Sequence, residues 1–418
     1  MTAQVCCADL WFILSCHGLA RQPKPSCHTD QVSYLLAFAG FAALVILHEL
    51  GHFAAAKAVG MRVERFSLFF PPLIWRWRPK GSETEYAVGA IPLGGYVKIT
   101  GMSPEEEMAP EVAHRAYFRQ KVWKRIVVIA AGPLVNIVLA FLILWALYAS
   151  STLVLTQPVV AKVTPHSPAA EVLKPGDKVL SVDGTPGYSP TLTLPDGPDR
   201  VDAQMRAIVQ HTCAGKLRFG CHAKTPVKLV VLRADKRLSY EITPRYERLP
   251  AKAAAAARRA GDPEGRMLVG LQFGEQPYRF DVPGAAGYSV DRMWLITTTT
   301  VDSLVKLFYD KHARDQVSGV VGSYETTRES FEFDTKQAIN ILALISLSLG
   351  IINLFPFLPL DGGHIFWALA EKLRGKPIPF RIMERAGIVG FMLVIFLFYI
   401  GLSNDIGRLS SGEGFGVR

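Results

Sequence analysis

Three ionisable side chains interrupt one of the most apolar stretches of this chain. Residues 41–56 read FAALVILHELGHFAAA, so His48, Glu49 and His52 follow seven apolar residues. Positions i and i+4 share one face of a helix, which places both imidazoles on the same side. Two histidines at this spacing can bind Zn²⁺, and the glutamate between them can take a proton from water. The pattern predicts a hydrolytic zinc site with His48 and His52 as ligands and Glu49 as the acid/base.

The segment that carries this motif is long enough to cross a lipid bilayer. Half of the 418 residues are hydrophobic, and the mean hydropathy is +0.21. A span of about 20 residues crosses a hydrocarbon core of roughly 30 Å, and ionisable residues inside it are costly and usually functional. We expect four transmembrane helices, at residues 32–59, 126–150, 338–364 and 386–402.

A third metal ligand is expected from a distant part of the chain, because catalytic zinc usually has three protein ligands and one open position. The segment NLFPFLPLDGGH, residues 353–364, follows the third apolar stretch. Pro356 and Pro359 must break the helix there, and irregular backbone inside a membrane needs a polar cavity. Asp361 is the preferred third ligand, and His364 is the alternative.

The distribution of basic residues predicts the orientation in the membrane. Residues 57–125 contain twelve Lys and Arg, and residues 372–385 contain five more. The positive-inside rule places both segments in the cytoplasm and the region 156–336 outside. Much of the net charge of +10 is therefore explained by topology, without a nucleic-acid partner.

The remaining segments differ in character. Residues 89–99, GAIPLGGYVKI, have the glycine and proline content of a β-hairpin within a cytoplasmic loop, 60–125. Residues 156–246 read as short strands with turns, and 247–337 as a linker followed by a surface amphipathic helix near 288–308. Cys213 and Cys221 lie in the outer region, where a disulfide is expected. Residues 1–31 are predicted to be a disordered extension and 403–418 a C-terminal tail.

Four motifs together resemble the site-2 protease family of intramembrane zinc metalloproteases, in the bacterial subtype similar to regulators of sigma-E protease. They are HELGH (48–52), GAIPLGGYVKI (89–99), AGPLVN (131–136) and NLFPFLPLDGGH (353–364). PGDKVLSVDG (175–184) resembles the core of a PDZ domain. The resemblance implies a multi-pass α-helical membrane protein with a re-entrant β-hairpin and an extracytoplasmic PDZ-like α+β domain at 156–246.

The resemblance also implies roles for individual residues. Zn²⁺ would be bound by His48, His52 and Asp361, with Glu49 as general acid/base and Asn353 contacting the substrate or the oxyanion. The glycine-rich segment would pair with the substrate as a strand. The substrate-binding residues implied are Gly94, Gly95, Tyr96 and Asn136.

The implied activity is hydrolysis of peptide bonds in or near transmembrane segments, with the active site towards the cytoplasmic side of the cell membrane. Expected partners are the lipid bilayer and single-span membrane proteins, such as anti-sigma factors, or remnant signal peptides. One alternative is a catalytically inactive membrane scaffold that binds peptides through its PDZ-like part, and the intact Glu49 argues against it. Another is a metal transporter, which should show repeated spans that we do not find in this sequence.

Overall fold

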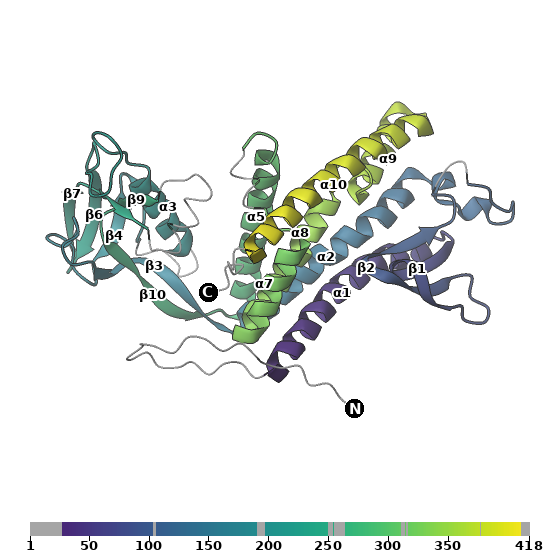
Figure 1. Ribbon diagram of the computed structural model, residues 1–418, viewed down its shortest axis with the longest axis horizontal. Helices are drawn as coiled ribbons and strands as arrows, with labels where there is room; N and C mark the ends of the chain where they lie inside the picture. The colour runs from purple at the N-terminus through teal and green to yellow at the C-terminus, as the bar shows by residue number, and fades with distance from the viewer. Residues whose placement is uncertain are drawn as a thin grey trace.

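The computed structural model describes residues 27–102, 106–189, 197–249, 254, 264–310, 314, 317–376 and 378–410. Four of its helices are long and apolar enough to cross a membrane, which confirms the number of spans predicted. These helices are α1 (Cys27–Ala58), α2 (Val122–Ser150), α8 (Thr335–Asn353) and α10 (Phe380–Ser410). In Figure 1 they lie between a strand-rich domain and a smaller two-stranded sheet.

The ends of the chain differ in part from the prediction. Residues 1–26, with three of the N-terminal cysteines, lie outside the described residues, as do residues 411–418. The expected extension reached residue 31, but Cys27 already begins α1. Helix α10 likewise continues to Ser410, so the predicted boundary of the C-terminal tail at residue 403 was too early.

The long helices approach one another closely at small residues. A Cβ atom added to Gly51 of α1 would lie 2.7 Å from the carbonyl oxygen of Ala131 in α2. A Cβ atom added to Gly350 of α8 would lie 2.9 Å from the carbonyl oxygen of Pro133. Small residues allow such contacts between membrane helices, where packing rather than water exclusion drives association. Helix α2 is therefore in contact with both α1 and α8.

The third span ends before the two prolines, Pro356 and Pro359. Helix α8 stops at Asn353, and α9 (Asp361–Arg374) begins at the aspartate itself. The span predicted for residues 338–364 was therefore too long at its C-terminal end. Gly362 and Gly363 pack directly on the backbone of residues 354–358, where an added Cβ would lie 2.1 and 2.5 Å from backbone atoms. Only glycine fits this approach, so these two residues seat the first turn of α9 against the break.

Two further helices accompany the spans. Helix α5 (Val282–Lys306) contains most of the amphipathic helix predicted near 288–308, and its Met293 packs against Ala140 and Leu347. Helix α7 (Val320–Phe333) was not predicted. The buried Asp405 of α10 accepts hydrogen bonds from the backbone N–H groups of Gly319 and Gly322, at 3.0 and 2.7 Å, and so caps the start of α7.

The segment between α1 and α2 contains a compact sheet formed by β1 (Val63–Trp77) and β2 (Glu85–Ile99). The short 3-10 turns η1 (Ala113–Arg115) and η2 (Tyr117–Arg119) follow it. Leu68 of β1 has partners in both halves of β2, Gly95 on one side and Val88 on the other. The segment 89–99 is extended as predicted, but it is one arm of a larger hairpin and its partner is β1.

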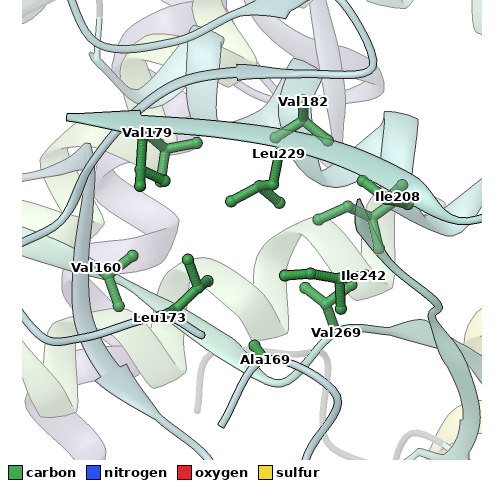
Figure 2. Packing of buried hydrophobic residues seen from close by; sticks show 11 residues of the cluster. Val160, Ala169, Leu173, Val179, Val182, Ile208, Leu229, Ile242 and Val269 are labelled. Atoms are coloured by element: carbon green, nitrogen blue, oxygen red, sulfur yellow. The ribbon is translucent and has the colours of Figure 1, made fainter. Parts of the chain in front are cut away.

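The domain between α2 and α5, called the outer domain below after the location expected from the sequence, is built on a sheet with the strand order β10-β3-β4-β6-β7, and β5 pairs with β4. Its elements are β3 (Thr152–Val163), β4 (Lys178–Val182), β5 (Thr185–Pro186), α3 (Gly197–Val209), β6 (Val227–Arg233), β7 (Lys236–Ile242) and β10 (Leu271–Arg279). Figure 2 shows its core, which includes Val160, Val179, Leu229 and Ile242. Each such side chain contributes about 1.5–3 kcal/mol when fully buried.

The boundary of this outer domain lies later than the sequence indicated. Strand β10 pairs antiparallel with β3 from Leu271↔Val163 to Arg279↔Thr152. The predicted end at residue 246 was therefore wrong, because part of the segment taken as a linker supplies an edge strand of the sheet. The domain begins and ends at adjacent residues, since Thr152 and Arg279 are paired.

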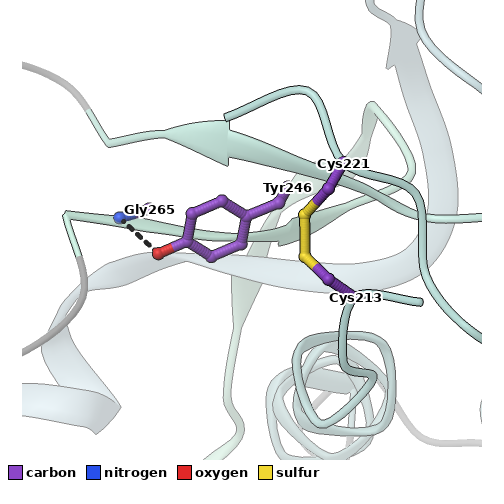
Figure 3. Close-up of a disulfide and its surroundings, with 4 residues drawn as sticks. All are labelled: Cys213, Cys221, Tyr246 and Gly265. Atoms are coloured by element: carbon purple, nitrogen blue, oxygen red, sulfur yellow. Dashed lines mark hydrogen bonds between the residues drawn. A yellow bond between two sulfur atoms is a disulfide. The ribbon is translucent and has the colours of Figure 1, made fainter. Parts of the chain in front are cut away.

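The predicted disulfide between Cys213 and Cys221 is present, with the two Cα atoms 5.9 Å apart (Figure 3). It packs beside Tyr246, whose hydroxyl accepts a hydrogen bond from the backbone N–H of Gly265 at 3.1 Å. These residues connect the loop before β6 to a separate pair of strands, β8 (Arg245–Arg248) and β9 (Gly265–Leu268). The bridge thus adds a covalent link to this corner of the domain.

Candidate metal centre

The two histidines of the HELGH motif face each other on α1. Their Nε2 atoms lie 3.2 Å apart, and both side chains are buried. The i, i+4 spacing places them on one face of the helix, as predicted.

Asp361 completes a group of three ligand atoms. Its Oδ2 atom lies 3.3 Å from Nε2 of His48 and 3.3 Å from Nε2 of His52. Among the described residues, these three form the one group whose ligand atoms converge closely enough to hold a metal ion. The structure therefore brings together the ligand set predicted from residues that are far apart in the sequence.

The spacing of the three ligand atoms fits zinc. Tetrahedral Zn²⁺ with bonds of about 2.0–2.1 Å to nitrogen and oxygen has its ligand atoms about 3.3–3.4 Å apart. The observed separations are 3.2, 3.3 and 3.3 Å. Two imidazole lone pairs and a carboxylate oxygen point towards one another here. Because such electron-rich atoms repel, they need a cation or shared protons between them, and a divalent ion satisfies all three at once.

The orientation of His52 is set by α2. Its Nδ1 atom donates a hydrogen bond to the carbonyl oxygen of Val128, at 2.9 Å. A carbonyl can only accept, so Nδ1 carries the proton and Nε2 keeps its lone pair for the metal. The next turn of α2 leaves room for the ring only because it carries a glycine. A Cβ atom added to Gly132 would lie 2.2 Å from Nε2 of His52. This contact gives the glycine of the AGPLVN motif a physical role.

Glu49 is half-buried beside the β2 strand. A Cβ added to Gly95 would lie 2.9 Å from Cγ of Glu49 and 2.9 Å from the carbonyl oxygen of Ser67. Gly95 therefore has to be glycine for the strand to pass this close to the carboxylate side chain. Gly94 packs against the ring of Phe70, and Tyr96 stacks on that same ring with centroids 6.4 Å apart. The structure thus places Gly94, Gly95 and Tyr96 in the segment next to Glu49.

The two asparagines named from the sequence occupy different settings. Asn353 is the last residue of α8 and is half-buried. Asn136 of α2 is fully buried, and among the residues that the structure describes neither atom of its side-chain amide has a hydrogen-bond partner. The hydroxyl of Ser346 donates a hydrogen bond to the backbone carbonyl oxygen of Asn136 at 2.9 Å. Neither asparagine belongs to the group of metal ligands.

His364, the alternative third ligand, lies one turn after Asp361 on α9. It is half-buried but does not belong to the converging group. The geometry therefore favours Asp361 of the two.

Sequence reasoning missed the residues of α2 that contact the ligand-bearing elements. Nζ of Lys124 donates to the carbonyl of Val59, just after α1, at 2.8 Å. The guanidinium of Arg125 donates to Oε1 of Glu371 in α9 at 2.7 Å. A detectable signal existed, because Arg125 stands at the start of an apolar helix, but its partner lies 246 positions away in the chain.

The fold and this centre define a membrane-embedded metallopeptidase, and comparison with known proteins agrees. Residues 36–397 match the model of Peptidase family M50. The chain belongs to this family, the site-2 protease family, as its motifs predicted, and it is a metalloprotease whose metal is zinc.

Several relatives are similar to this chain over almost its whole length. A Rhizobium meliloti protein named "Putative zinc metalloprotease" is 30% identical over 379 aligned positions, covering 88% of this chain and 94% of the relative. The regulator of sigma-E protease RseP of Escherichia coli is 28% identical over 455 aligned positions, covering 91% and 99%. The regulator of sigma E protease of Salmonella typhi is 29% identical over 444 positions, covering 88% and 96%.

Proposed function

We propose that this protein cleaves peptide bonds in or near the transmembrane segments of other membrane proteins. The observation that carries the proposal is the position of the three ligands: two lie on an apolar helix long enough to span a bilayer, and the third begins α9 just after another. Single-span proteins, anti-sigma factors among them, and remnant signal peptides are the substrates that suit such a site. The role is regulated intramembrane proteolysis.

We assign the chemistry to a small set of residues. Zinc, when bound by His48, His52 and Asp361, supplies a Lewis acid and an acidified water. Glu49 accepts the proton of the attacking water and later returns it to the leaving amide nitrogen. The side-chain amide of Asn353, at the end of α8, donates to the oxygen that becomes negative during attack.

The substrate is proposed to bind as a strand along β2. A helical segment hides its amides in internal hydrogen bonds, so it must unwind before a peptide bond is accessible. Pairing with the segment around Gly94, Gly95 and Tyr96 would satisfy the freed backbone groups next to Glu49. We infer that the β1–β2 hairpin is re-entrant and that transmembrane segments which unwind easily are preferred. A panel of substrates with added Gly or Pro in the span tests this, and equal cleavage of all members would count against it.

Orientation and gating are part of the proposal. The Lys and Arg distribution supports a cytoplasmic β1–β2 hairpin, an active site towards that side, and an outer domain on the opposite face. We propose that the outer domain is PDZ-like and restricts access by large ectodomains. Because Thr152 and Arg279 are paired, residues 152–279 can be replaced by a short linker without pulling α2 and α5 apart. Unchanged selection between substrates with large and small ectodomains would refute gating.

The decisive experiment for the activity is Glu49→Gln in the full-length protein. This change should retain zinc, because Glu49 is outside the ligand set, and should lower cleavage by a factor of about 10²–10⁴. An inactive peptide-binding scaffold is the competing function, and its peptide binding would be unaffected by the substitution. Unaltered proteolysis in Glu49→Gln would exclude the assigned role of this residue.

A further inference from the structure

The first turns of α2 contact both elements that supply metal ligands. Lys124 donates to the carbonyl of Val59 at the end of α1, and the Val128 carbonyl accepts from His52. Between these two positions, Arg125 donates to Glu371 of α9. About one turn of a single helix, residues 124–128, therefore contacts the segment with His48 and His52 and also the segment with Asp361.

Helix α9 needs such a contact because it is not continuous with a span. Seven irregular residues, 354–360, separate it from α8, so the direction of α8 does not determine where Asp361 points. The helix is seated at its start by Gly362 and Gly363 and along its length by Ile365, which packs on a cluster that contains Val128. Near its far end, the carboxylate of Glu371 is the charged contact with α2.

The pair formed by Arg125 and Glu371 is well defined, with a buried arginine and a half-buried glutamate. The Arg125 side chain is 3% exposed and that of Glu371 is 24% exposed, with 2.7 Å between nitrogen and oxygen. The guanidinium also lies 5.7 Å from the ring centre of Phe118. Within the described part of the chain, Nε of Arg125 has no hydrogen-bond partner. Burying an arginine in this way is costly, and such a pair gives little net stability, so its contribution is better sought in geometry.

We propose that Arg125 is a positioning residue of the metal centre. By binding Glu371 it fixes α9 on α2, and it thereby holds Asp361 at its distance from His52, whose ring the same helix orients through Val128. The residue acts through α9 and touches neither metal nor substrate. This inference rests on the proposed ligand set, His48, His52 and Asp361.

The test measures metal binding rather than proteolysis. Full-length protein in nanodiscs is stripped of metal and titrated with Zn²⁺ against a chromophoric chelator, and with Co²⁺ to record the visible spectrum of the site. The variants are Arg125→Gln, Glu371→Gln and both together. Loss of an outer contact that orients a ligand typically lowers metal affinity about 10–100-fold. We expect each single change to do so and the double change to be no worse than either, because both remove one interaction.

A matched control is the pair formed by Arg233 and the buried Asp177 in the outer domain, which has a nitrogen–oxygen distance of 2.6 Å. Arg233→Gln should leave zinc affinity and the Co²⁺ spectrum unchanged. If a single variant at the proposed pair does not fold, the exchanged protein Arg125→Glu/Glu371→Arg replaces it. Restored folding together with restored zinc affinity supports the proposal, and folding without restored affinity overturns it.

A further variant, Asp361→Ala, distinguishes failure of the positioning role from failure of the proposed ligand set. If Asp361→Ala loses zinc while Arg125→Gln and Glu371→Gln keep the affinity of the unaltered protein, Arg125 is not a positioning residue. If the losses of zinc affinity in the two single variants multiply in the double variant, the two residues act independently, and Arg125 is again not a positioning residue. If Asp361→Ala itself keeps zinc, the ligand set is wrong, and the failure lies with the proposed function.

Discussion

The imidazole of His52 donates a hydrogen bond from Nδ1 to the carbonyl oxygen of Val128, across the interface of α1 and α2, at 2.9 Å. The backbone of one span thus determines which nitrogen of the histidine on another span faces the metal. The Val128 carbonyl belongs to the backbone and cannot be removed by a side-chain substitution. The orientation of the His52 ring is therefore tested by changing the side chains that pack around it.

Gly132→Ala is therefore expected to impair metal binding. The new methyl group would lie 2.2 Å from Nε2 of His52 and must push the ring away from the centre. We expect a loss of zinc affinity of about 10–100-fold, measured by chelator competition. Gly287→Ala in α5 is the control, because in the described structure its added Cβ would meet no heavy atom within 4 Å beyond its chain neighbours and its own helix backbone. An unchanged affinity in Gly132→Ala would show that the ring has room to move without losing its ligand position.

Gly95→Ala should separate catalysis from metal binding. The added Cβ would lie 2.9 Å from both Glu49 Cγ and the Ser67 carbonyl, so the strand and the carboxylate cannot both keep their places. Zinc affinity should be retained, and turnover should fall by a factor of about 10² or more, as for a displaced general base. Gly274→Ala in β10 meets only ordinary contacts, at 3.4 Å and beyond, and should be active. Full activity in Gly95→Ala would place the working position of Glu49 elsewhere.

Removing the disulfide should loosen one corner of the outer domain. The bridge joins Cys213 to Cys221 across a sequence separation of 8, and closing a loop of this size is worth about 2–3 kcal/mol in the chain-entropy account. In Cys213→Ser/Cys221→Ser we expect faster hydrogen exchange in the loop before β6 and in β8 and β9. Exchange in α1 and α2 and the zinc affinity should not change. Equal exchange in the corner with and without the bridge would contradict this.

The outer domain should lose stability in acid through Asp177. Burial raises the pKa of this carboxyl, but hydrogen bonds from Arg233 and from the backbone N–H of Lys174 lower it by more, so the net pKa lies below the ordinary value. A depressed folded-state pKa stabilises the fold above the unfolded value of about 3.9, and that contribution is lost as the pH falls through the folded value.

Each unit of this pKa depression is worth about 1.4 kcal/mol. Hydrogen exchange of β4 and β6, corrected for intrinsic rates, should therefore show weaker protection from about pH 4 downward. Asp177→Asn, which cannot ionise, should remove this part of the pH dependence. The same acid-induced loss in Asp177→Asn would assign it to other groups.

The sequence was sufficient for the features that depend on local pattern. The four apolar spans follow from composition, and the facing of His48 and His52 follows from the helical repeat. The break before Asp361 follows from Pro356 and Pro359. These predictions depend on covalent geometry and on the cost of polar groups in lipid, which act over a few residues.

Features that depend on tertiary contacts were missed or misplaced. The pairing of β10 with β3 joins strands more than a hundred residues apart, so the end of the outer domain could not be read from composition. Helix α7 is polar, and its start is capped by Asp405, which belongs to the last helix of the chain. Arg125 looked like an ordinary basic residue at a membrane boundary until Glu371 was found beside it.

The origin of the ligands in α1 and α9 also bears on biosynthesis. His48 and His52 leave the ribosome early, whereas Asp361 belongs to the last fifth of the chain. Until that part is inserted and docked, a nascent chain holds only two of the three proposed zinc ligands. On the proposed ligand set, we expect the nascent chain to be inactive while its spans are inserted into the bilayer, and to gain proteolytic activity only when translation is nearly complete.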